Sequence, residues 1–158
     1  MISQENCQPS IDLVARLRGV PDTLRRLCGE RTMEELQQPA QDGGVAVVEL
    51  LCDLQDWEEI TGERITRILR EQRPLLESYD DSLWNIEHDY ASRDAHAVIE
   101  AFAISRERNV EILADLGESA WQREAELENR GPVTLQWLME RTANHDDRHI
   151  AEIMEALA

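Results

Sequence analysis

Two histidines near the carboxyl end of the chain have the spacing of a pair of metal ligands. His145 and His149 are four residues apart in a segment that contains neither glycine nor proline. On a helix both lie within ~20° of Leu138, in the middle of the apolar face, with Cβ atoms ~5–6 Å apart. Two imidazoles at that separation can bind one divalent ion. They could also be polar core residues, but burying two imidazoles without partners is costly, which favours a metal site.

A third ligand has to come from a facing helix, and Asp53 is the best-placed candidate. It lies ~100° from Leu54, on the shoulder of an apolar helical face, whereas Asp56 points nearly opposite Leu54 and is expected to contact solvent. Together with His145 and His149 it would form a site of two imidazoles and one carboxylate, which suits Zn, Ni, Mn or Fe(II). The alternative is an ordinary helix-edge acid in a chain with 33 acidic residues.

Glu152 follows His149 by about one helical turn and faces inward by the same geometry. It is a candidate ligand, a hydrogen-bond partner of an imidazole or a general base, and the sequence leaves these roles open. The segment resembles the HExxH motif of zinc proteases, but Asp146, one methylene shorter, occupies the position of the motif's glutamate. Zinc-protease chemistry is therefore poorly supported.

The other side chains with chemical potential are interpreted as structural. Cys52 has no basic neighbour that would lower its pKa, so we expect an unreactive thiol. His88 and His96 have no partner at ligand spacing and are expected on the surface. The four tryptophans are expected to pack in the core and at its rim.

The elements that position these residues are predicted to be helices, because glycine and proline are scarce and apolar residues recur at helical spacing. The four long helices are expected at about residues 10–29, 45–73, 94–116 and 132–158. Gly19 and Pro21 predict a kink or a break in the first of them. The third is expected to bury Val98, Ala101, Phe102, Ser105, Ile112 and Leu116.

Short helices are expected in the connections, at residues 32–37 and 83–90. Thr32 and Glu35 form the sequence pattern of a capping box, Asp94 is the expected N-cap of the third long helix, and Gly117 is its expected C-cap. No strand is predicted. The sequence thus predicts one domain, residues 1–158, with an all-α fold: an antiparallel four-helix bundle with short extra helices in its connections.

Composition excludes several classes of function. The formal net charge is −17, and all sixteen basic residues are arginines. Such a chain repels nucleic acid and anionic membranes, and without lysine it has neither a Schiff-base residue nor a P-loop lysine. Three cysteines without a CxxC pair, no signal-peptide pattern and no apolar run of ~20 residues predict a cytoplasmic protein with no membrane span.

Several motifs, taken in order, resemble the DinB-like (DinB/YfiT) metalloprotein superfamily over about residues 10–157. They are Glu49 to Glu58 (ELLCDLQDWE), Arg64, Phe102 with Arg106, Trp121 with Arg123, Gly131 to Leu135 (GPVTL), and His145-Asp146 with His149. The resemblance implies an antiparallel four-helix bundle, often a homodimer. It also implies a divalent ion such as Zn or Ni bound by three histidines, one on the second helix and two on the last.

The two histidines of the last helix correspond to His145 and His149, and the helix-two histidine corresponds to Asp53. This chain therefore departs from the family at one ligand, with a carboxylate in place of an imidazole. Some relatives are transferases or isomerases that use a low-molecular-weight thiol such as bacillithiol or mycothiol. The resemblance thus implies a thiol S-transferase that acts on electrophilic small molecules, with hydrolysis as the next reading. The alternative is a non-catalytic, stress-related bundle with a degenerate metal site.

Overall fold

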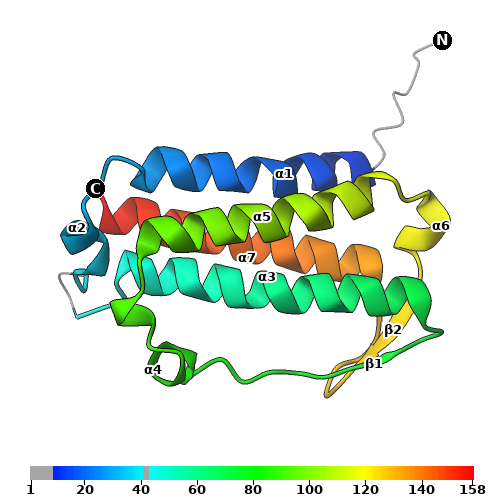
Figure 1. Cartoon of the computed structure of the whole chain (residues 1–158). Helices are drawn as coiled ribbons and strands as arrows, with labels where there is room; N and C mark the ends of the chain where they lie inside the picture. Colours follow the sequence, from blue (N-terminus) through cyan, green and yellow to red (C-terminus); the bar gives the residue numbers. More distant parts are fainter. Residues whose placement is uncertain (1–8, 41–42) are drawn as a thin grey trace, which may run out of the picture.

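Four long helices run side by side along the molecule (Figure 1). In this computed structural model, which describes residues 9–40 and 43–158, they are α1 (Pro9–Cys28), α3 (Val47–Arg70), α5 (Ala95–Ala114) and α7 (Leu135–Ala156). Cys7 lies outside the described residues. The predicted all-α four-helix bundle is confirmed, and none of the described helices is long and apolar enough to cross a membrane.

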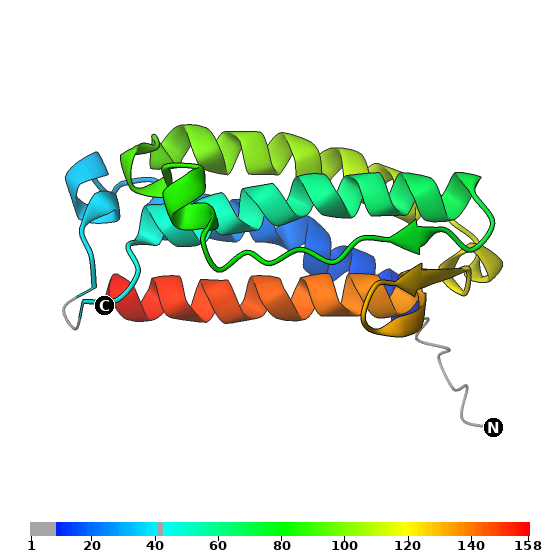
Figure 2. The same ribbon diagram turned by 90° about the horizontal axis from the view of Figure 1, so that it is seen from below.

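The order of the helices around the bundle differs from their order in the chain. Both α1 and α3 pack against α5 and α7, so that α1 and α3 lie on opposite corners. The pairs α1/α5 and α3/α7 are antiparallel, whereas α3 and α5 run in the same direction (Figure 1). A parallel pair needs a connection that returns along the whole bundle, and residues 71–94 form it. Figure 2 shows this connection passing back along α3 on the side of α7.

The connections contain further short helices. These are α2 (Met33–Gln37), α4 (Trp84–Glu87), the 3₁₀ helix η1 (Tyr90–Ser92) and α6 (Glu118–Trp121). The capping box is confirmed, because the Thr32 hydroxyl accepts from the Glu35 backbone N–H at 3.1 Å and the Glu35 carboxylate accepts from that of Thr32. Asp94 caps α5 as predicted. The prediction for Gly117 is wrong: α5 ends earlier with Asp115 in right-handed geometry, and Gly117 instead precedes α6.

The expectation of no strand is also wrong. Three short strands, β1 (Leu75–Leu76), β2 (Glu124–Leu127) and β3 (Gly131–Thr134), form a sheet in which β1 and β2 are parallel and β2 and β3 antiparallel. The β2–β3 turn places Asn129 and Gly131 at positive φ, which these residue types tolerate best. Strands of two to four residues are too short for periodicity to reveal them.

The sheet also moves helix boundaries. Helix α7 begins at Leu135 rather than at residue 132, because the preceding four residues belong to β3. Helix α1 is one continuous helix through Pro21, so the chain is not divided into two short helices there. Two residues expected inside α5, Ala101 and Ile112, are exposed, since α5 turns Arg106 and its neighbours inward instead.

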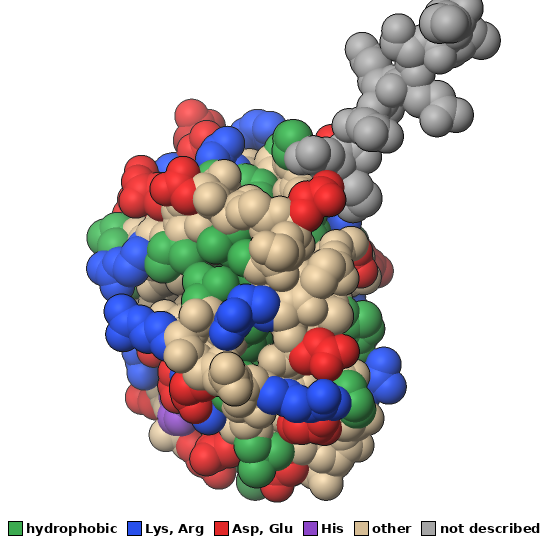
Figure 3. All heavy atoms as spheres, turned by 90° about the vertical axis from the view of Figure 1, so that its right-hand side faces the viewer, with side chains coloured by type: hydrophobic (Ala, Val, Ile, Leu, Met, Phe, Trp, Pro, Cys, Tyr) green, Lys and Arg blue, Asp and Glu red, His purple; other side chains and the backbone are tan. Residues whose placement is uncertain are grey.

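Two apolar clusters fill the bundle, one at each end. The first surrounds α2 and the beginnings of α3 and α5, and the second joins the sheet, Trp121 and the beginning of α7. Buried charged side chains lie in the bundle as well, among them Glu58, Arg106 and Asp146. Figure 3 shows the surface at one end of the bundle. There, arginines and acidic residues are interspersed around an area of apolar side chains.

Candidate metal centre

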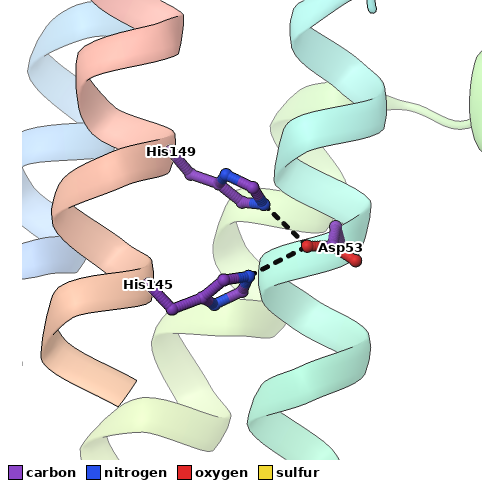
Figure 4. Close-up of side chains that lie close together, drawn as sticks. All are labelled: Asp53, His145 and His149. Atoms are coloured by element: carbon purple, nitrogen blue, oxygen red, sulfur yellow. Dashed lines mark hydrogen bonds and ion pairs between the residues drawn. The ribbon is translucent and has the colours of Figure 1, made fainter. Parts of the chain in front are cut away.

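Asp53, His145 and His149 converge between α3 and α7. The Nε2 atoms of His145 and His149 lie 3.0 and 2.6 Å from the same oxygen, Asp53 Oδ2. The other carboxylate oxygen points away from both rings (Figure 4). The predicted side chains are thus brought together from positions 92 and 96 residues apart in the chain.

Local sequence explains how the two histidines come to share a direction. Thr134 caps α7 by accepting from the Trp137 backbone N–H at 3.1 Å, and the helix then runs without interruption through both histidines. Residues four apart on such a helix are neighbours, and the two imidazole centroids are 4.4 Å apart. The Asp53 carboxylate comes from the facing, antiparallel helix.

The centre is partly shielded from solvent. The side chains of Asp53 and His145 are each 18% exposed, and that of His149 is 10% exposed. Burial alone raises the pKa of the Asp53 carboxyl, but the hydrogen bonds and positive charge of His145 and His149 outweigh it and lower the pKa to about 2. Asp53 is therefore a carboxylate at any physiological pH.

The donor set fits a divalent ion. One ligand atom from each residue lies within 4.8 Å of the others. In addition, His149 Nδ1 is buried and makes no hydrogen bond to the described residues, although Glu152 Oε1 lies 3.5 Å away. An imidazole that ligates through Nε2 carries its proton on Nδ1, where a carboxylate commonly accepts it. Glu152 thus lies where an outer partner of a metal-bound histidine would be expected.

Next to this centre lies a second cluster of charges, which sequence reasoning missed as a unit. The Arg106 guanidinium, on α5, donates to both carboxylate oxygens of Glu58 on α3 and of Asp146 on α7, at 2.8–3.0 Å. It also donates to the Leu17 backbone carbonyl of α1 at 3.0 Å. All three charged side chains are 2% exposed. A single side chain thereby connects all four long helices.

One sequence signal for this cluster was available. Pro21 has no N–H, so the carbonyl of Leu17, four residues earlier, lacks its helical partner. Arg106 supplies the missing donor. A proline inside an otherwise continuous helix, together with an arginine one turn after Phe102 on an apolar face, is consistent with a buried guanidinium, but neither signal identifies the partner carboxylates.

A cavity of about 380 Å³ adjoins the centre. It lies between α3 and α7, is lined on one side by Ser78, Tyr79 and Asp81 of the long connection, and has His145 in its wall. Trp57 is beside His145, with ring centroids 6.4 Å apart, and its Nε1 donates to Asp81 Oδ2 at 3.0 Å. A small molecule in this cavity would therefore lie next to the metal centre, on the side where His145 forms the wall.

Comparison with known families agrees with this architecture. The sequence matches the family model of the DinB superfamily over residues 16–153, nearly nine-tenths of the chain. The chain belongs to the DinB superfamily. A search of curated proteins finds no match.

Among solved structures, this DinB-superfamily chain resembles YfiT from Bacillus subtilis. The two share 24% sequence identity with a TM-score of 0.86, over 99% of this chain and 88% of YfiT. YfiT is described as a probable metal-dependent hydrolase with an unusual four-helix bundle topology. At this identity the likeness establishes the fold that the two proteins share.

Other predicted residues of the DinB-like chain have more partners than expected. Asp56 is only partly exposed, with 26% of its side chain accessible: its carboxylate accepts from the Tyr90 hydroxyl and lies 2.8 Å from His88 Nδ1, because the long connection folds back over this face of α3. His88 remains 42% exposed, and His96 is partly buried against the Arg31 carbonyl. The tryptophans pack as expected, with Trp121 fully buried.

Cys52 is a structural thiol, as the sequence indicated. It is buried and forms no disulfide among the described residues, and burial raises its pKa to about 12. Burial likewise raises the pKa of Cys28 to about 11. Neither thiol is a nucleophile at neutral pH.

Proposed function

We propose that this protein binds a divalent metal ion through Asp53, His145 and His149 and is a thiol S-transferase that acts on electrophilic small molecules. The observation that carries the proposal is the convergence of one carboxylate and two imidazoles, with the ligand atoms within 4.8 Å of one another, beside a cavity. An ion bound there would lower the pKa of a thiol or water in its open positions.

The residues of the chain have separable roles in this proposal. Asp53 supplies the one negatively charged ligand, so the site should favour Mn or Fe(II) more than a site of three imidazoles would, without excluding Zn or Ni. Glu152 would hold the Nδ1 proton of His149. The described cysteines, Cys28 and Cys52, are buried with raised pKa values, so neither is the nucleophile, and we take the thiol to be an external, low-molecular-weight co-substrate.

Hydrolysis is the second candidate reaction. YfiT, which has the same fold, is described as a probable metal-dependent hydrolase, and the same ion and cavity could activate a water instead of a thiol. The two reactions differ in one requirement, because only the transferase needs an added thiol.

Metal content tests the first step. Protein purified without a His-tag or chelator should contain about one equivalent of a transition metal. Asp53→Ala should lower the metal content as much as His149→Ala does, Asp53→His should restore tight Zn or Ni binding, and His88→Ala should behave as wild type. A metal-free wild-type protein would instead favour a non-catalytic bundle with a degenerate site. Unchanged metal content in Asp53→Ala would place the third ligand elsewhere, with Glu152 next.

Activity separates the two reactions. Metal-loaded protein should consume monochlorobimane faster than the uncatalysed reaction only when bacillithiol, mycothiol or another small thiol is present, and His149→Ala should lose this activity. Equal rates of p-nitrophenyl acetate hydrolysis with and without thiol, and no bimane conjugation, would support the hydrolase.

A homodimer is proposed from the family resemblance. Sedimentation at micromolar concentration should show a species of twice the 18.2 kDa chain mass. An 18 kDa species alone would remove this part of the proposal.

A further inference from the structure

The cavity beside the metal centre has an unusual charge for this protein. Four arginines line it, in a chain whose net charge is −17. Its three lining carboxylates already have partners: Glu58 and Asp146 both bind Arg106, and Asp81 accepts from Trp57. Arg148 lies 4.0 Å from Glu152, which leaves Arg64 and Arg141 as the lining arginines that form no ion pair among the described residues.

The Arg64 side chain is held in place by two aromatic rings and a backbone hydrogen bond. Its guanidinium lies 5.7 Å from the ring centroid of Trp57 and 5.8 Å from that of Tyr79, and it donates to the Glu77 carbonyl at 2.7 Å. Among the described residues it forms no ion pair, although the charge of Glu63 is near enough to raise its pKa, and its buried Nε atom has no hydrogen-bond acceptor. A half-buried guanidinium held between aromatic rings, with an unsatisfied donor, has capacity for a further acceptor.

Arg141, on α7, adds a second positive charge to the same cavity. Its guanidinium stacks on Trp137, with 5.3 Å to the ring centroid, rather than on a carboxylate. Burial lowers the pKa of Arg64, and the positive charge of Arg141 lowers it further, so the two cations are close enough to repel each other. An anion between them would remove that repulsion and could form charge-assisted hydrogen bonds.

From this arrangement we infer that the cavity binds a small organic acid, whose carboxylate or phosphate is held by Arg64 and Arg141 while its apolar part lies along Trp57 toward His145. The volume of about 380 Å³ falls in the range of small-molecule sites. The assignment of the other end of the ligand to the metal centre rests on the proposed function, whereas the anion anchor does not. The substrate or the thiol would thus be recognised by its negative charge.

Three simple probes test the anchor: phenylacetate, phenylphosphate and the neutral phenylacetamide, titrated calorimetrically into the full-length protein. At least one of the two acids should bind with a Kd about tenfold lower than that of the amide, since a charge-assisted hydrogen bond is worth at least that factor. Whichever acid binds more tightly identifies the preferred anionic group. Equal affinities for both acids and the amide would overturn the inference.

Variants assign the binding to the two arginines. Arg64→Gln and Arg141→Gln should each raise the Kd of the preferred acid about tenfold and leave that of the amide unchanged. Arg108→Gln, at an exposed position of α5, is the matched control and should bind as wild type. Circular dichroism checks folding. Because Arg141 is exposed, its variant tests the anchor even if Arg64→Gln does not fold, and an unchanged Kd in Arg141→Gln would contradict it.

The same titrations after removal of metal with EDTA separate this inference from the proposed function. The acid should still bind, because the arginines do not belong to the metal centre. Acid binding by a wild-type protein that takes up no divalent metal, even when metal is added back, would leave the anchor standing and refute the proposed function. A protein that binds metal but does not distinguish the acids from the amide would refute the anchor alone.

Discussion

Two clusters of charged side chains link α3 and α7, and they differ in how many of their polar atoms have hydrogen-bond partners within the protein. The cluster around Arg106 is 2% exposed, and the guanidinium meets two carboxylates and a backbone carbonyl. In the cluster around Asp53, exposure is 10–18%, one oxygen accepts from both imidazoles, and His149 Nδ1 makes no hydrogen bond to the described residues, with Glu152 Oε1 3.5 Å away. The first has no capacity left for a ligand, whereas the second does. We therefore assign the first to the stability of the bundle and the second to function.

Removing the arginine should have the largest effect. Arg106→Met leaves two buried carboxylates without a counter-ion, so the free energy of unfolding should fall by about 4 kcal/mol and Tm by about 10 °C. Thermal and urea denaturation of the metal-free protein measure both. The triple variant Arg106→Met/Glu58→Gln/Asp146→Asn should recover part of the loss, because no buried charge remains. A triple variant less stable than the single one would show that unpaired charge is not the cause.

The Asp53 cluster should instead stabilise the protein through metal. With free Zn²⁺ at a hundred times its Kd, the wild-type free energy of unfolding should rise by about 2.7 kcal/mol. His149→Ala should show no such rise, and His88→Ala should respond as wild type. Denaturation in EDTA and in Zn²⁺ measures the difference. An equal rise in His149→Ala would place the metal outside this cluster.

Acid should weaken the metal-free protein through Asp53. Since the pKa of Asp53 is lowered from 3.8 to about 2, the carboxylate contributes stability above pH ~4 that is lost as the pH falls toward 2. Relative to Asp53→Asn, whose side chain does not titrate, the wild type should lose ~2 kcal/mol over this range. Urea denaturation of both proteins from pH 6 to 2 tests this. A constant difference would mean that Asp53 is not stabilised by the histidines.

Glu152 should have a smaller effect, confined to metal affinity. Glu152→Gln removes the negative charge near His149 Nδ1 and should raise the Kd for Zn²⁺ about tenfold, which is less than the effect of His149→Ala. Glu155→Gln, an exposed acid of the same helix, is the control. Competition with a chromogenic chelator measures the Kd. An effect as large as that of His149→Ala would make Glu152 a direct ligand.

The two described cysteines, Cys28 and Cys52, should contribute nothing to the chemistry. In Cys7→Ser, Cys28 and Cys52 are the remaining thiols, and with pKa values of about 11 and 12 they should not react with a disulfide reagent at pH 8 until the protein unfolds. The rate of colour release with and without urea tests this. Fast labelling of the folded protein would show that Cys28 or Cys52 is reactive and would make it a candidate nucleophile.

Much of this protein could be predicted from local sequence. The extent of the long helices, the caps at Thr32 and Asp94, and the shared face of His145 and His149 depend on residues at most a few positions apart, and helical geometry alone fixes such relations. The position of Asp53 on the shoulder of its helix follows from the same periodicity, and family resemblance pointed to its role.

Contacts between segments far apart in the chain could not be predicted from local sequence. Neither the pairing of Arg106 with Glu58 and Asp146 nor the folding of the long connection over Asp56 leaves a periodic signal, because each depends on which helices are neighbours. The short strands are too brief to show alternation. The sequence by itself therefore determined the helices and the ligand pair on the last of them. Only the tertiary structure decided that Asp53 meets that pair and that a cavity lined by arginines lies beside it, since both require α3, α7 and the returning connection to pack together.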